Sequence, residues 1–128
     1  MFTGNAINWF EIPTTDIARA QAFYEAILGF PLVPMDMPGM SMRMFPIDNM
    51  AGVGGALIQM PEANTPSAQG TMVYINAHPD LQNVLDKVEA AGGSIAMPKT
   101  AITPEYGFMA VIIDTEGNRV GLHSGPSA

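Results

Sequence analysis

Apolar and polar residues follow the same pattern twice along the chain, once in each half. Residues 7–12 are aromatic and β-branched, which predicts a strand, and apolar positions within 16–29 recur at helical spacing. In the second half, 71–76 predicts a strand and 80–93 has the helical spacing. Each helical segment begins at an aspartate and ends at a glycine, which are favoured helix-capping residues. The chain therefore contains a weak internal repeat.

Short strand-like stretches follow each helical segment. They are 31–36, 41–48 and 53–60 in the first half, and 94–97, 107–114 and 119–123 in the second. We predict an α+β fold with two βαβββ modules that form a curved, open half-barrel sheet. A single domain of residues 1–128 would comprise module one at 1–60, a connector at 61–70 and module two at 71–124. Because one module cannot bury its own sheet face, the two would pair and leave a concave surface between them.

Composition narrows the classes of function. The chain has 128 residues, a net charge of −7 and only five basic residues, so nucleic-acid binding is not expected. The absence of cysteine excludes disulfides, a thiolate metal site and a thiol nucleophile. The longest clearly apolar run, at 108–113, is too short to span a bilayer, so we expect no membrane partner. No signal-peptide pattern opens the chain, which favours the cytoplasm.

Two longer segments carry a family resemblance. Residues 9–30 (WFEIPTTDIARAQAFYEAILGF) and 106–124 (YGFMAVIIDTEGNRVGLHS) resemble the opening and the C-terminal hairpin of the glyoxalase/bleomycin-resistance/dioxygenase group, the vicinal oxygen chelate superfamily. The resemblance covers nearly the whole chain and implies the paired-module fold and a homodimer. It selects no reaction, because this superfamily includes lyases, epimerases, dioxygenases, thiol transferases and drug-binding proteins.

The resemblance also implies where a metal would bind. Metal-dependent members of the glyoxalase I type have four ligand positions, which align here with Trp9, Gln59, Met72 and Gly121. Tryptophan and glycine provide no side-chain ligand, and a thioether is a poor ligand for hard divalent ions. One amide oxygen cannot hold a metal alone. We therefore expect the usual metal centre to be lost and no cofactor to be required.

Glu11 and His123 are candidate catalytic residues. Side chains alternate along a strand, so each would share a face with an aligned ligand position two residues away. They could form a shifted site for Zn, Ni, Mn or Fe, or a carboxylate–imidazole pair for proton transfer. In the alternative interpretation, Glu11 pairs with a cation at the cavity rim and His123 is a half-exposed residue near the C-terminus.

Other residues are candidates for contact with a ligand. Trp9 could stack against a flat molecule, or its ring could fill the space left by the metal centre. Tyr74 and Asn76 share a face with Met72 and could orient a ligand through a hydroxyl and an amide. The methionines at strand spacing within 35–44 could form an adaptable wall or ordinary packing.

These observations predict a protein that binds a small molecule in the cavity between its modules. The predicted ligand-binding residues are Trp9, Glu11, Gln59, Met72, Tyr74, Asn76 and His123. The alternative is an enzyme, either a lyase related to lactoylglutathione lyase or a dioxygenase, with a shifted divalent-metal site at Glu11 and His123.

Overall fold

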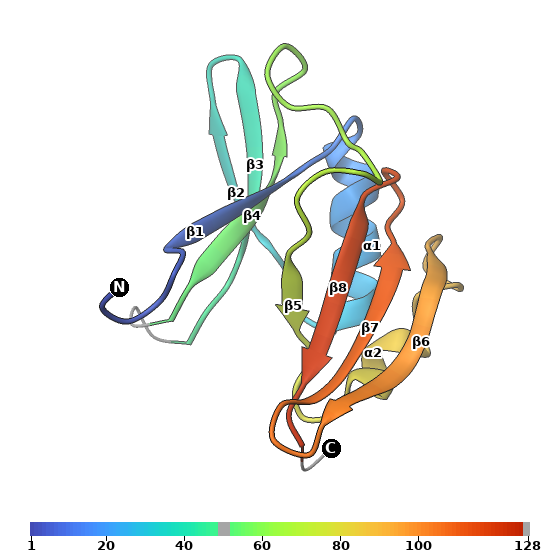
Figure 1. Cartoon of the computed structure of the whole chain (residues 1–128). Helices are drawn as coiled ribbons and strands as arrows, with labels where there is room; N and C mark the ends of the chain where they lie inside the picture. The colour runs from blue at the N-terminus through green and yellow to red at the C-terminus, as the bar shows by residue number, and fades with distance from the viewer. Residues whose placement is uncertain (49–51, 127–128) are drawn as a thin grey trace.

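A computed structural model describes residues 1–48 and 52–126. The first module comprises β1 (Trp9–Pro13), α1 (Ile17–Leu28), β2 (Val33–Met37), β3 (Met40–Phe45) and β4 (Gly54–Gln59). The second comprises β5 (Tyr74–Asn76), α2 (Leu81–Leu85), β6 (Ser94–Thr103), β7 (Gly107–Ile113) and β8 (Arg119–Ser124). The sheet orders, β1-β4-β3-β2 and β5-β8-β7-β6, are equivalent, and the sheets do not close into a barrel (Figure 1). The predicted fold of two βαβββ modules is confirmed.

The capping signals around the first helix act as the sequence indicates. Oδ1 of Asp16 accepts a hydrogen bond from the amide of Arg19 at 3.1 Å. At the other end, Gly29 adopts a φ of 85°, and its amide donates to the carbonyl of Glu25 at 2.9 Å. A left-handed residue that bonds back into the last turn is a common way to end a helix.

The second helix is shorter than predicted. Asp80 caps it through the amide of Gln82, but the α-helix ends at Leu85 and does not continue to Gly93. The amide of Val88 donates to the carbonyl of Leu85, three residues back, at 3.2 Å. This tighter bonding replaces the α-helical pattern, so 86–92 forms turns.

Some predicted strand boundaries were also wrong. The first strand of each module begins later than predicted, at Trp9 and Tyr74. The strand β6 is longer than the predicted 94–97, because it continues along β7 through several register shifts. Such bulges let a strand continue where its apolar pattern is interrupted.

One hydrophobic core joins the two modules. Phe23, Tyr24 and Ile27 of α1 are almost completely buried, as is Leu81 of α2. They belong to one cluster with the inner faces of both sheets. In Figure 1 both helices lie behind β7 and β8. Neither module buries its helix alone, so the modules are expected to fold as one unit.

The hairpin turn between β7 and β8 contributes polar contacts to the same junction. Asp114 is 4% exposed, and its Oδ2 accepts a hydrogen bond from the hydroxyl of Tyr24 at 2.8 Å. Its carboxylate also accepts bonds from the amides of Glu116 and Asn118 and from the side chain of Asn118. Burial, together with the negative charge of Asp114, raises the pKa of Tyr24 well above its ordinary value. The hydroxyl therefore remains protonated and donates to the carboxylate.

Glu116 in the same turn binds the start of α1. Its carboxylate accepts bonds from the amides of Thr15 and Asp16 at 2.9 Å, and Arg19 Nε donates to it at 2.7 Å. Its side chain is fully buried, which by itself would raise its pKa. The hydrogen bonds from Arg19, Asp16, Thr15 and Thr115 outweigh burial and lower the pKa of Glu116 to about 2.

This pKa predicts an acid-dependent contribution to stability. Because the pKa of Glu116 is lower in the folded state, its contribution is present above pH 4.5 and is lost as the pH falls toward about 2. We expect Glu116→Gln to lower the free energy of unfolding by about 2–3 kcal/mol near neutral pH. The difference in unfolding free energy between the variant and wild type should shrink steadily as the pH falls from 4.5 toward about 2. Urea unfolding of both proteins at several pH values in this window measures that difference. A difference that does not change with pH would contradict the prediction.

Neither α1 nor α2, in the part of the chain that the structure describes, has the length and apolar run that a membrane-spanning helix needs.

Candidate functional site

A large cleft separates the two modules. β5 forms the edge of the second sheet that faces the first module (Figure 1), and β1 forms an edge of the first sheet. No Cα atom of β1 lies within 8 Å of one in β5, so the two edges do not pair. The cleft between them has a volume of about 1230 Å³. Most of its lining is apolar, and this includes Ile7, Trp9, Phe10, Leu28, Phe45, Ile47, Val53, Met72, Val73 and Ile75.

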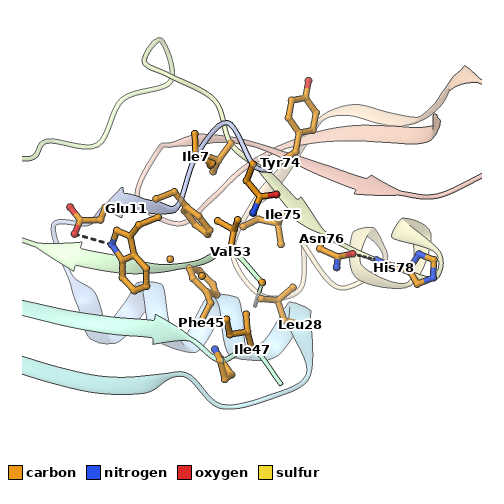
Figure 2. A pocket seen from close by; sticks show the side chains of 18 of the residues that line it. Ile7, Glu11, Leu28, Phe45, Ile47, Val53, Tyr74, Ile75, Asn76 and His78 are labelled. Atoms are coloured by element: carbon orange, nitrogen blue, oxygen red, sulfur yellow. Dashed lines mark hydrogen bonds between the residues drawn. The ribbon is translucent and has the colours of Figure 1, made fainter. Parts of the chain in front are cut away.

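Trp9 lies at the mouth of this cleft on the open face of the first sheet. Its side chain is 45% exposed, and its ring would lie 3.3 Å from a Cβ atom at Gly54. The missing side chain of Gly54 therefore allows the indole to lie close to the sheet. The indole Nε1 donates to Oε2 of Glu11 at 3.3 Å, as Figure 2 shows. An aromatic face and a carboxylate are thus held together at the cleft.

Two of the predicted contact residues approach the cleft from β5. Oδ1 of Asn76 accepts a hydrogen bond from the amide of His78 at 3.0 Å, which orients its side-chain amide at the rim. The ring of Tyr74 covers Gly121, where a Cβ atom would lie 2.4 Å from it. In Figure 2 the hydroxyl of Tyr74 points away from the cleft. Tyr74 therefore offers its ring rather than its hydroxyl to this space.

Gln59 lies on the other face of the first sheet. It shares that face with Leu57, which packs in the core beside α1. Its Oε1 accepts a hydrogen bond from the amide of Ile17 at 2.8 Å and so helps to cap α1. The structure thus gives Gln59 a role at the helix start and separates it from Trp9.

Glu11 and His123 are not brought together. Glu11 is on β1 and lines the cleft, whereas His123 is on β8 and is not among the residues that line it. No Cα atom of β1 lies within 8 Å of one in β8. Nε2 of His123 is 2.8 Å from the carbonyl oxygen of Tyr106. A carbonyl oxygen can only accept, so this ring nitrogen donates the hydrogen bond.

The four aligned ligand positions do not fit a divalent metal. The indole of Trp9 bonds to Glu11, Gln59 lies on the opposite face, and the ring of Tyr74 covers Gly121. Only the thioether of Met72 remains, and it is a poor ligand for hard ions. Within 1–48 and 52–126, no group of three or more His, Cys, Asp or Glu side chains could hold a metal ion.

The floor of the cleft was not predicted from the sequence. Phe10 and Phe45 stack there with ring centroids 5.7 Å apart, on the face of the first sheet opposite to Trp9, and Ile47 lines the cleft beside them. Phe10 occupies the space above Gly55, where a Cβ atom would lie 2.3 Å from its ring. The only available signal was apolar alternation, which predicts a core residue as readily as a cleft residue.

The methionines within 35–44 lie away from the cleft. They are on β2 and β3, and none of them is among the residues that line it. Among the described methionines, Met72 alone lines the cleft, and it is not part of the predicted wall.

Known proteins share both sequence and structure with this chain. Residues 7–46 match the family model described as bleomycin resistance protein-like N-terminal. The chain is 32% identical over 120 residues to proteins named "Putative glyoxylase CFP32" in Mycobacterium tuberculosis and Mycobacterium bovis. This alignment covers 90% of the chain but 44% of each relative, so the chain spans less than half of their length.

Solved structures share the fold at lower identity. A glyoxalase/bleomycin resistance protein from Albidiferax ferrireducens aligns with a TM-score of 0.67 and 16% identity, over 95% of this chain and 100% of that one. A glyoxalase-related enzyme from Fulvimarina pelagi aligns with a TM-score of 0.67 and 15% identity, over 94% and 88%. The paired modules, the family model and the related sequences agree. They support the resemblance of the chain to the glyoxalase/bleomycin-resistance superfamily, also called the vicinal oxygen chelate superfamily.

Proposed function

We propose that this protein binds a small, largely apolar molecule in the cleft between β1 and β5. The cleft itself is the observation that carries the proposal: about 1230 Å³ of mostly apolar lining with a few polar groups at the rim. Ligand sites in proteins combine these two properties, because apolar surface supplies affinity and a few polar groups fix orientation. The exposed indole of Trp9 favours a ligand with a flat ring.

The charge of the protein restricts the ligand further. Glu11 places a carboxylate in the cleft beside the indole, and the net charge of the chain is −7. Both features disfavour an anionic molecule, because they repel negative charge at the binding site and during approach. A neutral or cationic aromatic molecule fits these properties best.

A fluorescent probe tests this proposal. N-phenyl-1-naphthylamine is small, aromatic and uncharged, and its fluorescence rises in an apolar site. We expect it to bind the wild-type protein with saturation and to bind Trp9→Ala roughly tenfold more weakly, because the variant loses the stacking surface. Titration followed by fluorescence measures both affinities.

Tyr106→Ala is the matched control for that experiment. Tyr106 is 60% exposed and does not line the cleft, so this variant removes an aromatic ring elsewhere on the surface. Its affinity for the probe should equal that of wild type. Equal weakening in both variants, or unsaturable binding to wild type, would contradict the proposal.

The proposed binding does not require a metal at the four positions that align with the metal ligands of metal-dependent relatives. We expect calorimetric titration of the metal-free protein with Zn²⁺ or Ni²⁺ to show no tight site with one ion per chain, since the aligned side chains are unsuitable ligands. Tight binding that both Glu11→Ala and His123→Ala abolish would contradict this. It would favour instead a lyase or dioxygenase with a shifted metal site.

The proposal includes a homodimer. Trp9 and Tyr74 are 45% and 49% exposed in the described part of the chain. Apolar surface of this kind is typical of an interface. Light scattering at micromolar concentration should therefore give a dimer mass, and a monomer mass would contradict it.

A further inference from the structure

Methionines form opposed pairs on the open face of the first sheet. In the antiparallel register of β2 and β3, Met35 lies opposite Met42 and Met37 lies opposite Met40. Side chains directly opposite each other on one face have Cβ atoms about 5 Å apart. The two pairs are two residues apart along the strands, so they are neighbours on the same face. Four thioethers therefore share a small area.

The cluster is partly buried and partly open to solvent. Met42 is 7% exposed and packs against Ala56 and Ile58 of β4, so this part of the cluster is held against the sheet. Met35 and Met37 on β2 are 45% and 48% exposed. An ion from solvent could thus reach the sulfur atoms without any change in the fold.

The sheet face around the four methionines is almost entirely apolar. On this face of β1 to β4 the only ionisable side chain is Glu11, which lies on β1 at the opposite edge of the sheet from β2. Asp36 and Arg43 lie on the other face of β2 and β3, where their side chains pair at 3.0 Å. The cluster therefore offers soft thioether sulfur without a hard oxygen ligand beside it.

We propose that these four methionines, Met35, Met37, Met40 and Met42, form a binding site for a soft monovalent metal ion, Cu(I) or Ag(I). Thioether ligands suit such soft ions, whereas Mn²⁺ and Mg²⁺ prefer oxygen ligands. Met is unbranched and has three rotatable bonds, so sulfur atoms from opposite strands can converge on one ion. The site is separate from the cleft, because none of the four residues lines it.

Silver is a suitable probe because Ag(I) is not redox-active under ordinary conditions. Native mass spectrometry of the full chain with Ag(I) should show a single bound ion. Met35→Leu with Met42→Leu, and separately Met37→Leu with Met40→Leu, should each weaken binding at least about tenfold, since each removes one pair. Leu has nearly the volume of Met, so both variants should fold, as circular dichroism can verify.

The control variant makes the same change in the other module. Met97→Leu with Met109→Leu removes two methionines from β6 and β7 and should leave Ag(I) binding unchanged. Binding should also vary little between about pH 5.5 and 7.5, because a thioether has no proton to lose, whereas a site with a histidine ligand would weaken on acidification. Absence of a bound ion, retention of binding in both cluster variants, or loss in His123→Asn would overturn the proposal.

Discussion

Asp114→Ala is expected to lower the free energy of unfolding by about 3–4 kcal/mol, one of the two largest effects that we predict. The carboxylate of Asp114 is buried and accepts four hydrogen bonds, from Tyr24, Glu116 and Asn118. Removing it leaves the hydroxyl of Tyr24 buried among apolar side chains without this acceptor. Because that bond crosses from α1 to the β7–β8 turn, the variant weakens the junction of the two modules.

The effect can be measured by urea unfolding. Asp86→Ala is the matched control, because the side chain of Asp86 accepts an exposed hydrogen bond from Gln82 within the same turn of helix, and the substitution leaves its backbone bonds in place. That variant should differ from wild type by less than about 0.5 kcal/mol. Tyr24→Phe removes one of the four bonds and should fall between the two. If Asp114→Ala lowers the free energy of unfolding by less than about 1 kcal/mol, the β7–β8 turn does not stabilise the junction of the two modules.

Gly107→Ala should destabilise the protein by about 3 kcal/mol or more, through two separate causes. Gly107 has a φ of 85°, a conformation that is strained for any residue with a side chain. A Cβ atom there would also lie 2.4 Å from the carbonyl oxygen of Ser124 and 2.8 Å from the nitrogen of Pro126. Backbone atoms cannot move aside as a flexible side chain can, so β7 and β8 would have to separate.

Gly39→Ala distinguishes these two causes. Gly39 in the β2–β3 turn has a φ of 77°, but no atom lies within 4 Å of the added Cβ. This variant should therefore show the conformational strain alone, about 1 kcal/mol. Thermal or urea unfolding of both variants gives the difference. Equal losses would show that the close contact at Gly107 relaxes at little cost.

The sequence was informative about the modules because their signals are local. Asp16 and Gly29 act within a single turn of helix, and Asp80 has the same role in the second module. The early end of α2 was not predictable, because the segment after Leu85 keeps apolar residues at helical spacing while its hydrogen bonds tighten. Which strands pair depends on contacts far apart in sequence, and no local pattern gives the order β1-β4-β3-β2.

The site was harder to predict for a similar reason. In β4 the run Ala56, Leu57 and Ile58 is apolar on both faces, so alternation could not show that Gln59 lies beside α1. Strand spacing predicted that Trp9 and Glu11 share one face of the first strand. The structure confirms this, because the indole of Trp9 donates a hydrogen bond to the carboxylate of Glu11. The cleft depends on the separation of β1 and β5, which is a property of how the modules pack and leaves no local signal.

Nuclear magnetic resonance offers the most direct test of binding between β1 and β5. Trp9 is the single tryptophan of the chain, so the one indole N–H signal in the spectrum belongs to it and reports on the proposed site. We predict that titration with N-phenyl-1-naphthylamine shifts this signal, together with the amides of 54–55 and 71–76. Shifts confined to β6 and β7, or none at saturating probe, would contradict ligand binding in the cleft.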